Sequence, residues 1–338
     1  VGSEMCIRDR FLKYTVSAVA TMTLAGAAFA ADYTMRISHQ FPPSHPIPIL
    51  LEEFAKDVAA STDGKVDVKL YGGASLFKPN QQHAAVASGE IEAAIILSIQ
   101  WGGSLPEMAV TQLPFLMGSI DAEEQFTKSK AAEELTKLAL KKGVQNIAWI
   151  LDAPDEIFTS SKHPLDAPSK FKDVKMRGYN KLFDASLIAM GANPVSMPGS
   201  EVYQALQTGV VDAAVTAPKA AFTRKYSEVQ KYGVIIPVFP VFDNLMVNPA
   251  WWKGLPDDLR NAIQKAADKA AKSSFDEFRR SGPQDVKNLE EAGMEIKVIS
   301  DQKTLDEFKA VMYEPVRDAF FKSVGAKEGQ RLIDLISQ

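Results

Sequence analysis

The sequence predicts an α/β fold built from two similar domains and one long helix. Two observations predict it: strands and helices alternate in two successive series, and a long helical pattern follows both series. The chain has 338 residues, a length typical of two domains. Its 46% apolar residues can form substantial cores, which excludes disordered and collagen-like classes.

The first series opens with a strand at residues 33–37, where apolar and polar side chains alternate. A helix is expected at 48–61, with Leu50, Leu51, Phe54 and Val58 on one face. The series continues with a strand at 65–70, a helix at 81–87, a fully apolar strand at 93–97, a helix at 123–142 and a strand at 147–151.

The second series repeats this alternation about half the chain further on. We expect strands at 174–177, 193–197 and 210–215, separated by helices at 182–190 and 201–207. No low-complexity linker separates the two series, which favours domains joined by crossing strands. A long helix is expected from Asp257 to about Ala292, bent at Gly282–Pro283 and placed as a strut across both domains.

The N-terminal 30 residues have the pattern of a leader and secretory signal peptide, not of a folded element. Basic residues precede an apolar stretch that closes on Ala28-Phe29-Ala30, a typical cleavage site. A membrane-spanning helix is the alternative, but the uninterrupted stretch 14–29 is shorter than the roughly 20 residues a bilayer needs. Residues 1–10 fit neither pattern, and we suspect that they are not native. Cleavage would also remove Cys6, the one cysteine, which suits an oxidising compartment.

Composition and missing motifs argue against several functions. The formal net charge is -4 and no long run of like charge occurs, which argues against nucleic acid as a partner. The nucleophile-elbow, zincin, phosphate-loop and dinucleotide signatures are absent. His39 and His45 lack a third ligand nearby, so we expect neither a metal site nor a cofactor. Catalysis without a sequence signature stays open at this point.

Six segments after the expected strands, and one before the long helix, carry a more specific signal. They are SHQFPPSHP (38–46), KVDVKLYGGASL (65–76), ASGEIEAAI (87–95), QLPFL (112–116), FKDVKMRG (171–178), MGANPVSMPGSEVYQALQTGVVDAAV (190–215) and NPAWWKGLPDDLRNAI (248–263). In this order they resemble the DctP-type solute-binding subunits of tripartite ATP-independent periplasmic (TRAP) transporters, over nearly the whole chain after residue 30.

The resemblance implies a two-lobed periplasmic binding protein, a type II-like clamp with a long helix spanning both lobes. Lobe I would comprise 31–152 and about 241–265, lobe II 153–240 and about 266–300, and C-terminal helices at 301–338 would pack across the lobes. Such a subunit captures a small organic acid and delivers it to a sodium-driven membrane permease. We therefore expect a periplasmic, non-enzymatic monomer. A sensing module for a membrane receptor, or a periplasmic enzyme, are the alternatives.

The resemblance also implies ligand-binding residues. Arg177 in KMRG matches the family's carboxylate-binding arginine, and a guanidinium fork suits a carboxylate better than a lysine does. Trp101 either lines the cleft or belongs to the core. The remaining candidates lie where the family has pocket residues: Gln40, Ser98, Tyr179, Thr216 and Asn244. Trp251 and Trp252 are assigned to packing at the start of the long helix.

Three departures from better-known family members suggest the kind of solute. Glu156 lies near the position of a second arginine, Gly199 replaces an aromatic residue, and Thr216 replaces an asparagine. These changes remove a positive charge and enlarge the space near the ligand. We therefore expect a monocarboxylate with hydroxyl groups or an amine at its other end, from which Glu156 could accept hydrogen bonds.

Overall fold

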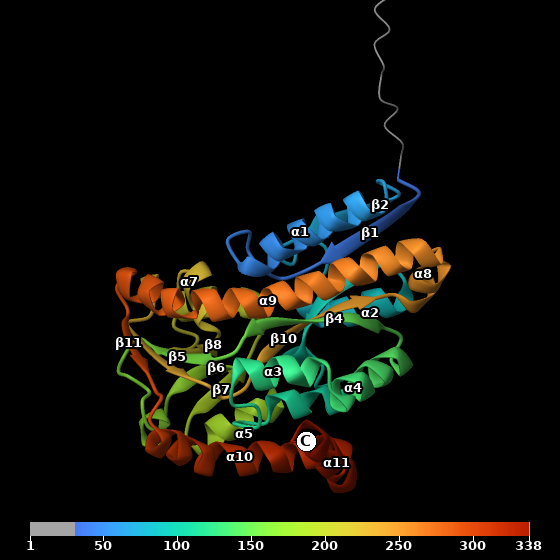
Figure 1. Ribbon diagram of the computed structural model, residues 1–338. Helices are drawn as coiled ribbons and strands as arrows, with labels where there is room; N and C mark the ends of the chain where they lie inside the picture. Colours follow the sequence, from blue (N-terminus) through green and yellow to red (C-terminus); the bar gives the residue numbers. More distant parts are fainter. Residues whose placement is uncertain (1–30, 338) are drawn as a thin grey trace, which may run out of the picture. The chain divides into compact units, whose positions relative to one another are not determined.

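A computed structural model describes residues 31–337, which form one compact unit. The expected signal peptide and Cys6 lie outside the described residues. Two mixed sheets with helices against them make up this unit, so the α/β prediction is confirmed (Figure 1). In the described residues no helix is both long and apolar enough to cross a membrane.

The first sheet collects its strands from two distant parts of the chain. In spatial order they are β2 (Val66–Tyr71), β1 (Tyr33–Ser38), β3 (Ala93–Leu97), β10 (Val241–Val247) and β4 (Gln145–Ala153). The strands β2, β1 and β3 are parallel, whereas β10 runs antiparallel to both of its neighbours. Thus β10 returns late in the sequence to the centre of a sheet formed by early strands.

The second sheet has six strands and holds most of the second series. Their order is β11 (Glu295–Val298), β9 (Tyr232–Ile236), β5 (Glu156–Ser160), β8 (Ala213–Thr216), β6 (Lys175–Gly178) and β7 (Asn193–Ser196). The strand β8 begins later than the expected 210–215 because Gly209 adopts a left-handed turn with φ of 72°. The expected helix 123–142 is two helices, because the Ser129 hydroxyl caps a new one by accepting from the N–H of Ala132.

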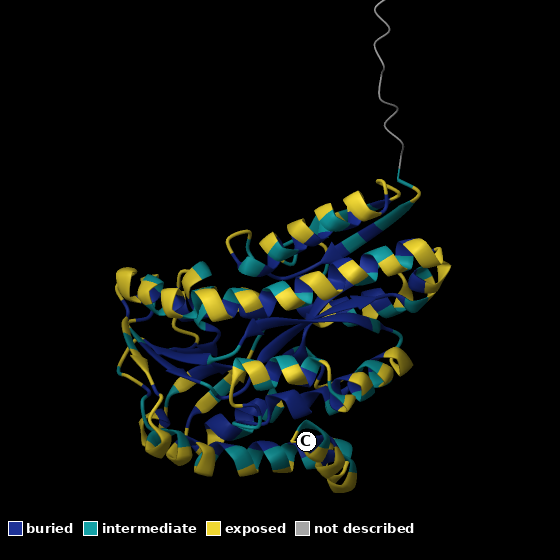
Figure 2. Ribbon diagram, viewed as in Figure 1, coloured by how far each residue is buried: buried dark blue, intermediate teal, exposed yellow. Residues whose placement is uncertain are grey.

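Helices cover these sheets and bury their strands (Figure 2). They are α1 (Pro46–Ser61), α2 (Pro79–Ser88), α3 (Ile120–Thr127), α4 (Lys130–Lys141), α5 (Lys181–Ala189), α6 (Val202–Gln207), α7 (Pro218–Thr223), α8 (Pro249–Gly254), α9 (Asp257–Glu291), α10 (Gln302–Val324) and α11 (Ala326–Ile336). The helix α1 buries Leu51, Phe54 and Val58 as its spacing predicts, whereas Leu50 is only partly buried. The largest apolar cluster joins both sheets, for example through Ile95 and Phe158.

The long helix α9 contacts elements beside both sheets. It lies against α1 and β4 on one side of the unit and against α7 and β11 on the other (Figure 1). At 35 residues it is about 52 Å long. The helix continues through Gly282 and Pro283 as one element, and its position confirms the predicted strut. The exact lobe boundaries stay a prediction.

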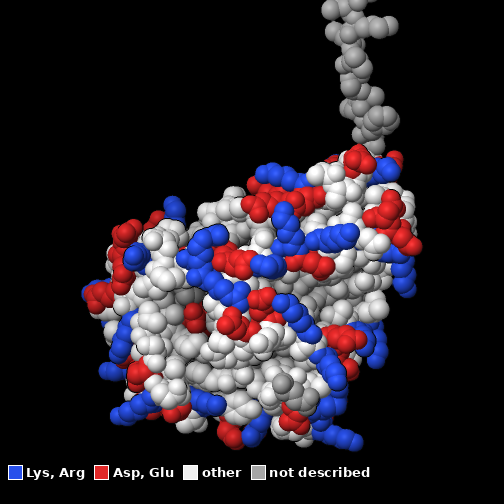
Figure 3. Space-filling model, viewed as in Figure 1, with Lys and Arg blue, Asp and Glu red and all other residues white. Residues whose placement is uncertain are grey.

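The C-terminal helices also join parts that are far apart in the sequence. The helix α10 contacts α5 and the short helical segment Pro106–Gln112, and α11 contacts that segment and α4. On the face shown in Figure 3, lysine and arginine side chains lie interspersed with acidic ones. Ion pairs along α9, such as Lys269–Asp57 and Arg279–Asp121, account for part of this mixture.

Candidate functional site

A small cavity lies where strands of both sheets end. Its volume is about 40 Å³. The first sheet contributes residues that follow β1 and β3 and the ends of β4 and β10, and the second contributes β6, β8 and the segment after β7. The polar residues that line it are Gln40, Gln100, Asp152, Arg177, Tyr179, Thr216 and Arg224. The carboxyl ends of strands are the usual ligand site of open α/β sheets.

Arg177 is buried on β6 and held firmly by the backbone. Its Nε and Nη2 atoms donate to the carbonyl oxygen of Met197 at 3.1 and 3.0 Å, and Nη1 donates to that of Val215 at 2.6 Å. The guanidinium also lies 4.4 Å from the centre of the Tyr179 ring. Arg177 is only 3% exposed, and within residues 31–337 it has no ion-pair partner. The protein therefore orients this cation without neutralising it.

A second arginine, Arg224, reaches the same cavity from the end of α7. Its guanidinium occupies the space over Gly199, where an added Cβ would clash with Nη1. From the sequence we expected Gly199 to enlarge the ligand space. That interpretation is wrong, because the Arg224 guanidinium fills this space and brings a positive charge to the cavity. The loss of a positive charge at Glu156 stays a prediction.

Glu156 lies behind the cavity wall. It is fully buried in β5, and the hydroxyl of Tyr179 donates to its Oε2. Burial raises the pKa of Glu156 well above its usual range, while the hydrogen bond from Tyr179 and the charge of Arg177 oppose this shift. Glu156 is thus connected to the cavity only through Tyr179. It does not line the wall, where it could accept a hydrogen bond from a solute.

The structure brings only some of the other candidates to the cavity. Gln40 and Thr216 line it, and both are 3% exposed. Trp101 is a core residue next to His83, with ring centres 4.8 Å apart. Ser98 is buried and its hydroxyl accepts from the backbone N–H of Phe242. Asn244 is buried within β10, away from the residues that line the cavity.

Sequence reasoning missed two charged residues of the cavity, Arg224 and Asp152. Asp152 directly follows the expected strand 147–151, so the rule that ligand residues follow strands could have found it. Arg224 offered no such signal, because it ends a helix of six residues. In the described residues no group of three or more histidine, cysteine or acidic side chains could hold a metal ion.

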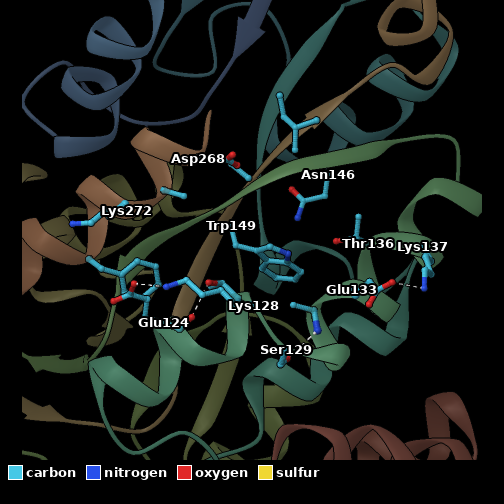
Figure 4. Close-up of a pocket in the computed structure, with 16 residues that line it drawn as sticks. Glu124, Lys128, Ser129, Glu133, Thr136, Lys137, Asn146, Trp149, Asp268 and Lys272 are labelled. Carbon is cyan, nitrogen blue, oxygen red and sulfur yellow. Dashed lines mark hydrogen bonds and ion pairs between the residues drawn. The ribbon is translucent and has the colours of Figure 1, made fainter. Parts of the chain in front are cut away.

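A larger cavity of about 790 Å³ lies between β4, α4 and α9 (Figure 4). Its charged residues pair with one another at the rim, for example Lys137 with Glu133 at 2.6 Å and Lys128 with Glu124 at 2.7 Å. It offers no buried cation comparable to Arg177. The smaller cavity is therefore the better candidate for an anionic solute.

Comparison with known proteins agrees with this geometry. The family model for bacterial extracellular solute-binding protein, family 7 (DctP), matches residues 37–323. The chain belongs to this family. A C4-dicarboxylate-binding periplasmic protein DctP from Rhodobacter capsulatus is 32% identical over 260 residues, covering 76% of this chain and 78% of the relative.

Solved structures of similar proteins show the fold of the DctP family. A TRAP periplasmic solute-binding protein from Desulfovibrio salexigens, with bound orotic acid, has a TM-score of 0.84 at 26% identity and covers 90% of this chain and 97% of that chain. One from Chromohalobacter salexigens, with bound D-glucuronate, has a TM-score of 0.82 at 28% identity and covers 90% and 99%. The predicted two-lobed binding-protein fold is confirmed.

Proposed function

We propose that this chain is the solute-binding subunit of a TRAP transporter, which captures a small carboxylate and delivers it to a sodium-driven permease. The observation that carries the proposal is Arg177, a buried cation that has no carboxylate partner in the part of the chain that the structure describes. An uncompensated buried charge is unfavourable unless a bound group neutralises it. The protein keeps such a cation at the junction of its two sheets, where an anion could reach it.

The hydrogen bonds of Arg177 leave the geometry that a carboxylate needs. A guanidinium has five N–H donors, and the carbonyl oxygens of Met197 and Val215 use three of them. One N–H on Nη1 and one on Nη2 therefore remain. These two N–H groups can donate to a carboxylate while the rest of the guanidinium stays held by the backbone, which a lysine ammonium cannot do.

Both lobes contribute to the proposed site. Gln40 and Asp152 come from the first sheet, and Arg177, Thr216 and Arg224 from the second. A solute between them would contact both sets only when the lobes are close together, so its binding would favour the closed form. The cavity of about 40 Å³ has room for only a few water molecules, since one needs roughly 10–15 Å³. This volume favours a small acid.

Location, processing and assembly belong to the same proposal. The periplasmic relative from Rhodobacter capsulatus supports a periplasmic location, which would require cleavage of the N-terminal segment after Ala30. We expect the secreted protein to be a monomer that needs no cofactor. N-terminal sequencing of the protein recovered from periplasm would locate the cleavage.

Ligand binding by an Arg177 variant tests the proposal. A thermal-shift screen of small organic acids would first find a ligand, because a bound ligand stabilises the folded state. Calorimetry should then show that Arg177→Ala loses on the order of 2–5 kcal/mol of binding free energy. Arg280→Ala is the control, since that side chain is 75% exposed on α9. Equal affinity of Arg177→Ala and the unaltered protein would refute the carboxylate site.

A further inference from the structure

Asp152 is an acid on the cavity wall that has no donor of its own. It lies near the end of β4 and is 4% exposed, and its Oδ1 atom has no hydrogen-bond partner among the described residues. Native proteins pair nearly all of their buried polar atoms. A buried carboxylate that lines a ligand cavity and has an oxygen without a hydrogen bond is therefore a candidate acceptor for a group on the ligand.

The nearest base does not satisfy Asp152. The Nε2 atom of His45 lies 3.6 Å from Asp152 Oδ1, which is too long for a hydrogen bond. The Nδ1 atom of His45 accepts from the N–H of Ile47 at 3.3 Å, so a neutral ring carries its proton on Nε2. Burial lowers the pKa of His45 well below its usual range, so the ring is neutral and does not compensate the charge of Asp152.

The other charged groups around Asp152 come from different elements. Asp243 on β10 is fully buried with both carboxylate oxygens unpartnered, and it repels a charge on Asp152. Arg224 at the end of α7 attracts that charge. Burial nevertheless dominates and raises the pKa of Asp152 to about 7. A hydrogen-bond donor on the ligand would relieve this unfavourable environment.

Glu156 differs from Asp152 in its position. Its Oε2 atom accepts from the Tyr179 hydroxyl, and although its Oε1 atom has no partner among the described residues, Glu156 is absent from the cavity wall. Of the two acids, only Asp152 can meet a solute directly.

We infer that Asp152 determines ligand specificity by accepting a hydrogen bond from a hydroxyl, N–H or ammonium group close to the carboxylate of the solute. The ligand class is thus a hydroxy, amino or lactam acid, and not a plain carboxylic acid. This inference rests on the proposed carboxylate site at Arg177. The donor must lie within a few atoms of the carboxylate, because Arg177 and Asp152 border the same small cavity.

Matched pairs of acids test the inference. Each pair has one member with a donor and one without it: lactate and propionate, malate and succinate, pyroglutamate and cyclopentanecarboxylate. Calorimetry on the unaltered protein should show a preference of about tenfold or more for the donor-bearing member of the pair that binds best. In Asp152→Asn this ratio should fall to about threefold or less, since a neutral amide accepts more weakly than a carboxylate.

Glu123→Gln is the matched control variant. Glu123 is also a buried acid with an unpartnered oxygen, but it lies outside the cavity wall. The control should keep the full ratio. Circular dichroism and thermal melting would check the fold of both variants. If Asp152→Asn does not fold, the affinity ratio measured with the unaltered protein alone tests the inference.

The outcomes separate the inference from the proposed function. A ratio near one in the unaltered protein, or a ratio unchanged in Asp152→Asn, would overturn the role of Asp152 while binding through Arg177 persists. Failure of every acid to bind the unaltered protein would instead overturn the carboxylate site, and the role of Asp152 with it.

Discussion

Arg177 and Arg224 reach the same cavity but are held in different ways. Arg177 extends from a strand, donates three hydrogen bonds to backbone carbonyl oxygens and lies against the Tyr179 ring. Arg224 ends a short helix, and the structure gives it space by placing Gly199 opposite its guanidinium. Within residues 31–337, neither has an ion-pair partner.

The difference indicates a division of roles. A guanidinium fixed by three hydrogen bonds loses little conformational freedom when a carboxylate binds, so its interaction free energy goes mostly into affinity. Arg224 has no such hydrogen bonds to backbone carbonyl oxygens among the described residues, so we expect its side chain to lose more conformational freedom on binding, which offsets part of its attraction. We therefore expect Arg177 to provide most of the affinity and Arg224 to add a smaller, adjustable part.

Replacing Arg177 by another cation should weaken binding more than any change at Arg224. Arg177→Lys keeps the charge but loses the fork, and one ammonium cannot serve the carbonyl oxygens of Met197 and Val215 and a carboxylate together. We expect calorimetry to show a loss on the order of 2 kcal/mol, about 30-fold in the dissociation constant. Binding by Arg177→Lys as tight as in the unaltered protein would show that charge alone is sufficient there.

A smaller effect is expected at Arg224, where a double-mutant cycle would sharpen the comparison. Arg224→Ala should weaken binding by about 1 kcal/mol, since the guanidinium is less fixed. Gly199→Ala should have a similar effect, because its Cβ would displace the Arg224 guanidinium.

In the Arg224→Ala background, Gly199→Ala should change the affinity little further, which calorimetry on the four proteins would measure. As a control, Gly199→Ala can be combined with Arg177→Ala. In that pair the losses of binding free energy should be nearly additive. Additive losses with Arg224→Ala would contradict the proposed contact.

Most of the fold could be predicted from the sequence, because its strands and helices follow their hydrophobic periods. The apolar run of β3 and the spacing of α1 gave correct elements. We did not predict β5, β9, β10 or β11 as strands from the sequence. The strand β11 has no buried residue to mark it, and β10 pairs with strands formed much earlier in the chain. Such pairing depends on tertiary contacts that no local pattern records.

The site was predicted less completely, and the reason is again tertiary. Arg177, Gln40, Thr216 and Tyr179 lie at or just after strand ends, where sequence reasoning looks for them, and they line one cavity. Trp101 occupies a similar position in the sequence but turns into the core. The relation between Arg224 and Gly199 joins two loops of the second sheet, so neither residue is informative without the other.

The last comparison uses the pH dependence of stability that Asp152 causes. Burial raises the pKa of Asp152 from 3.8 to about 7, and the charge of Arg224 opposes this rise. The folded protein therefore holds a proton that the unfolded chain has lost, so Asp152 destabilises the fold increasingly from pH 4 to pH 7 and by a constant amount above that. Removal of the carboxylate in Asp152→Asn should raise the melting temperature by about 2 °C or more at pH 8, and not at pH 4.

The effect of Asp152→Asn on the melting temperature can be measured against pH in three backgrounds. These are the unaltered protein, Arg177→Ala and Arg224→Ala. The gain in melting temperature caused by Asp152→Asn should level off near pH 7 in the unaltered protein and in Arg177→Ala. In Arg224→Ala it should keep growing above pH 7, because loss of the attracting charge raises the pKa of Asp152 further. His45 cannot produce this shift, since burial keeps its ring neutral, and Asp243 remains present in all the proteins. If the gain in melting temperature levelled off at the same pH in Arg224→Ala and Arg177→Ala, the two arginines would affect the pKa of Asp152 equally. That result would contradict the special role of Arg224.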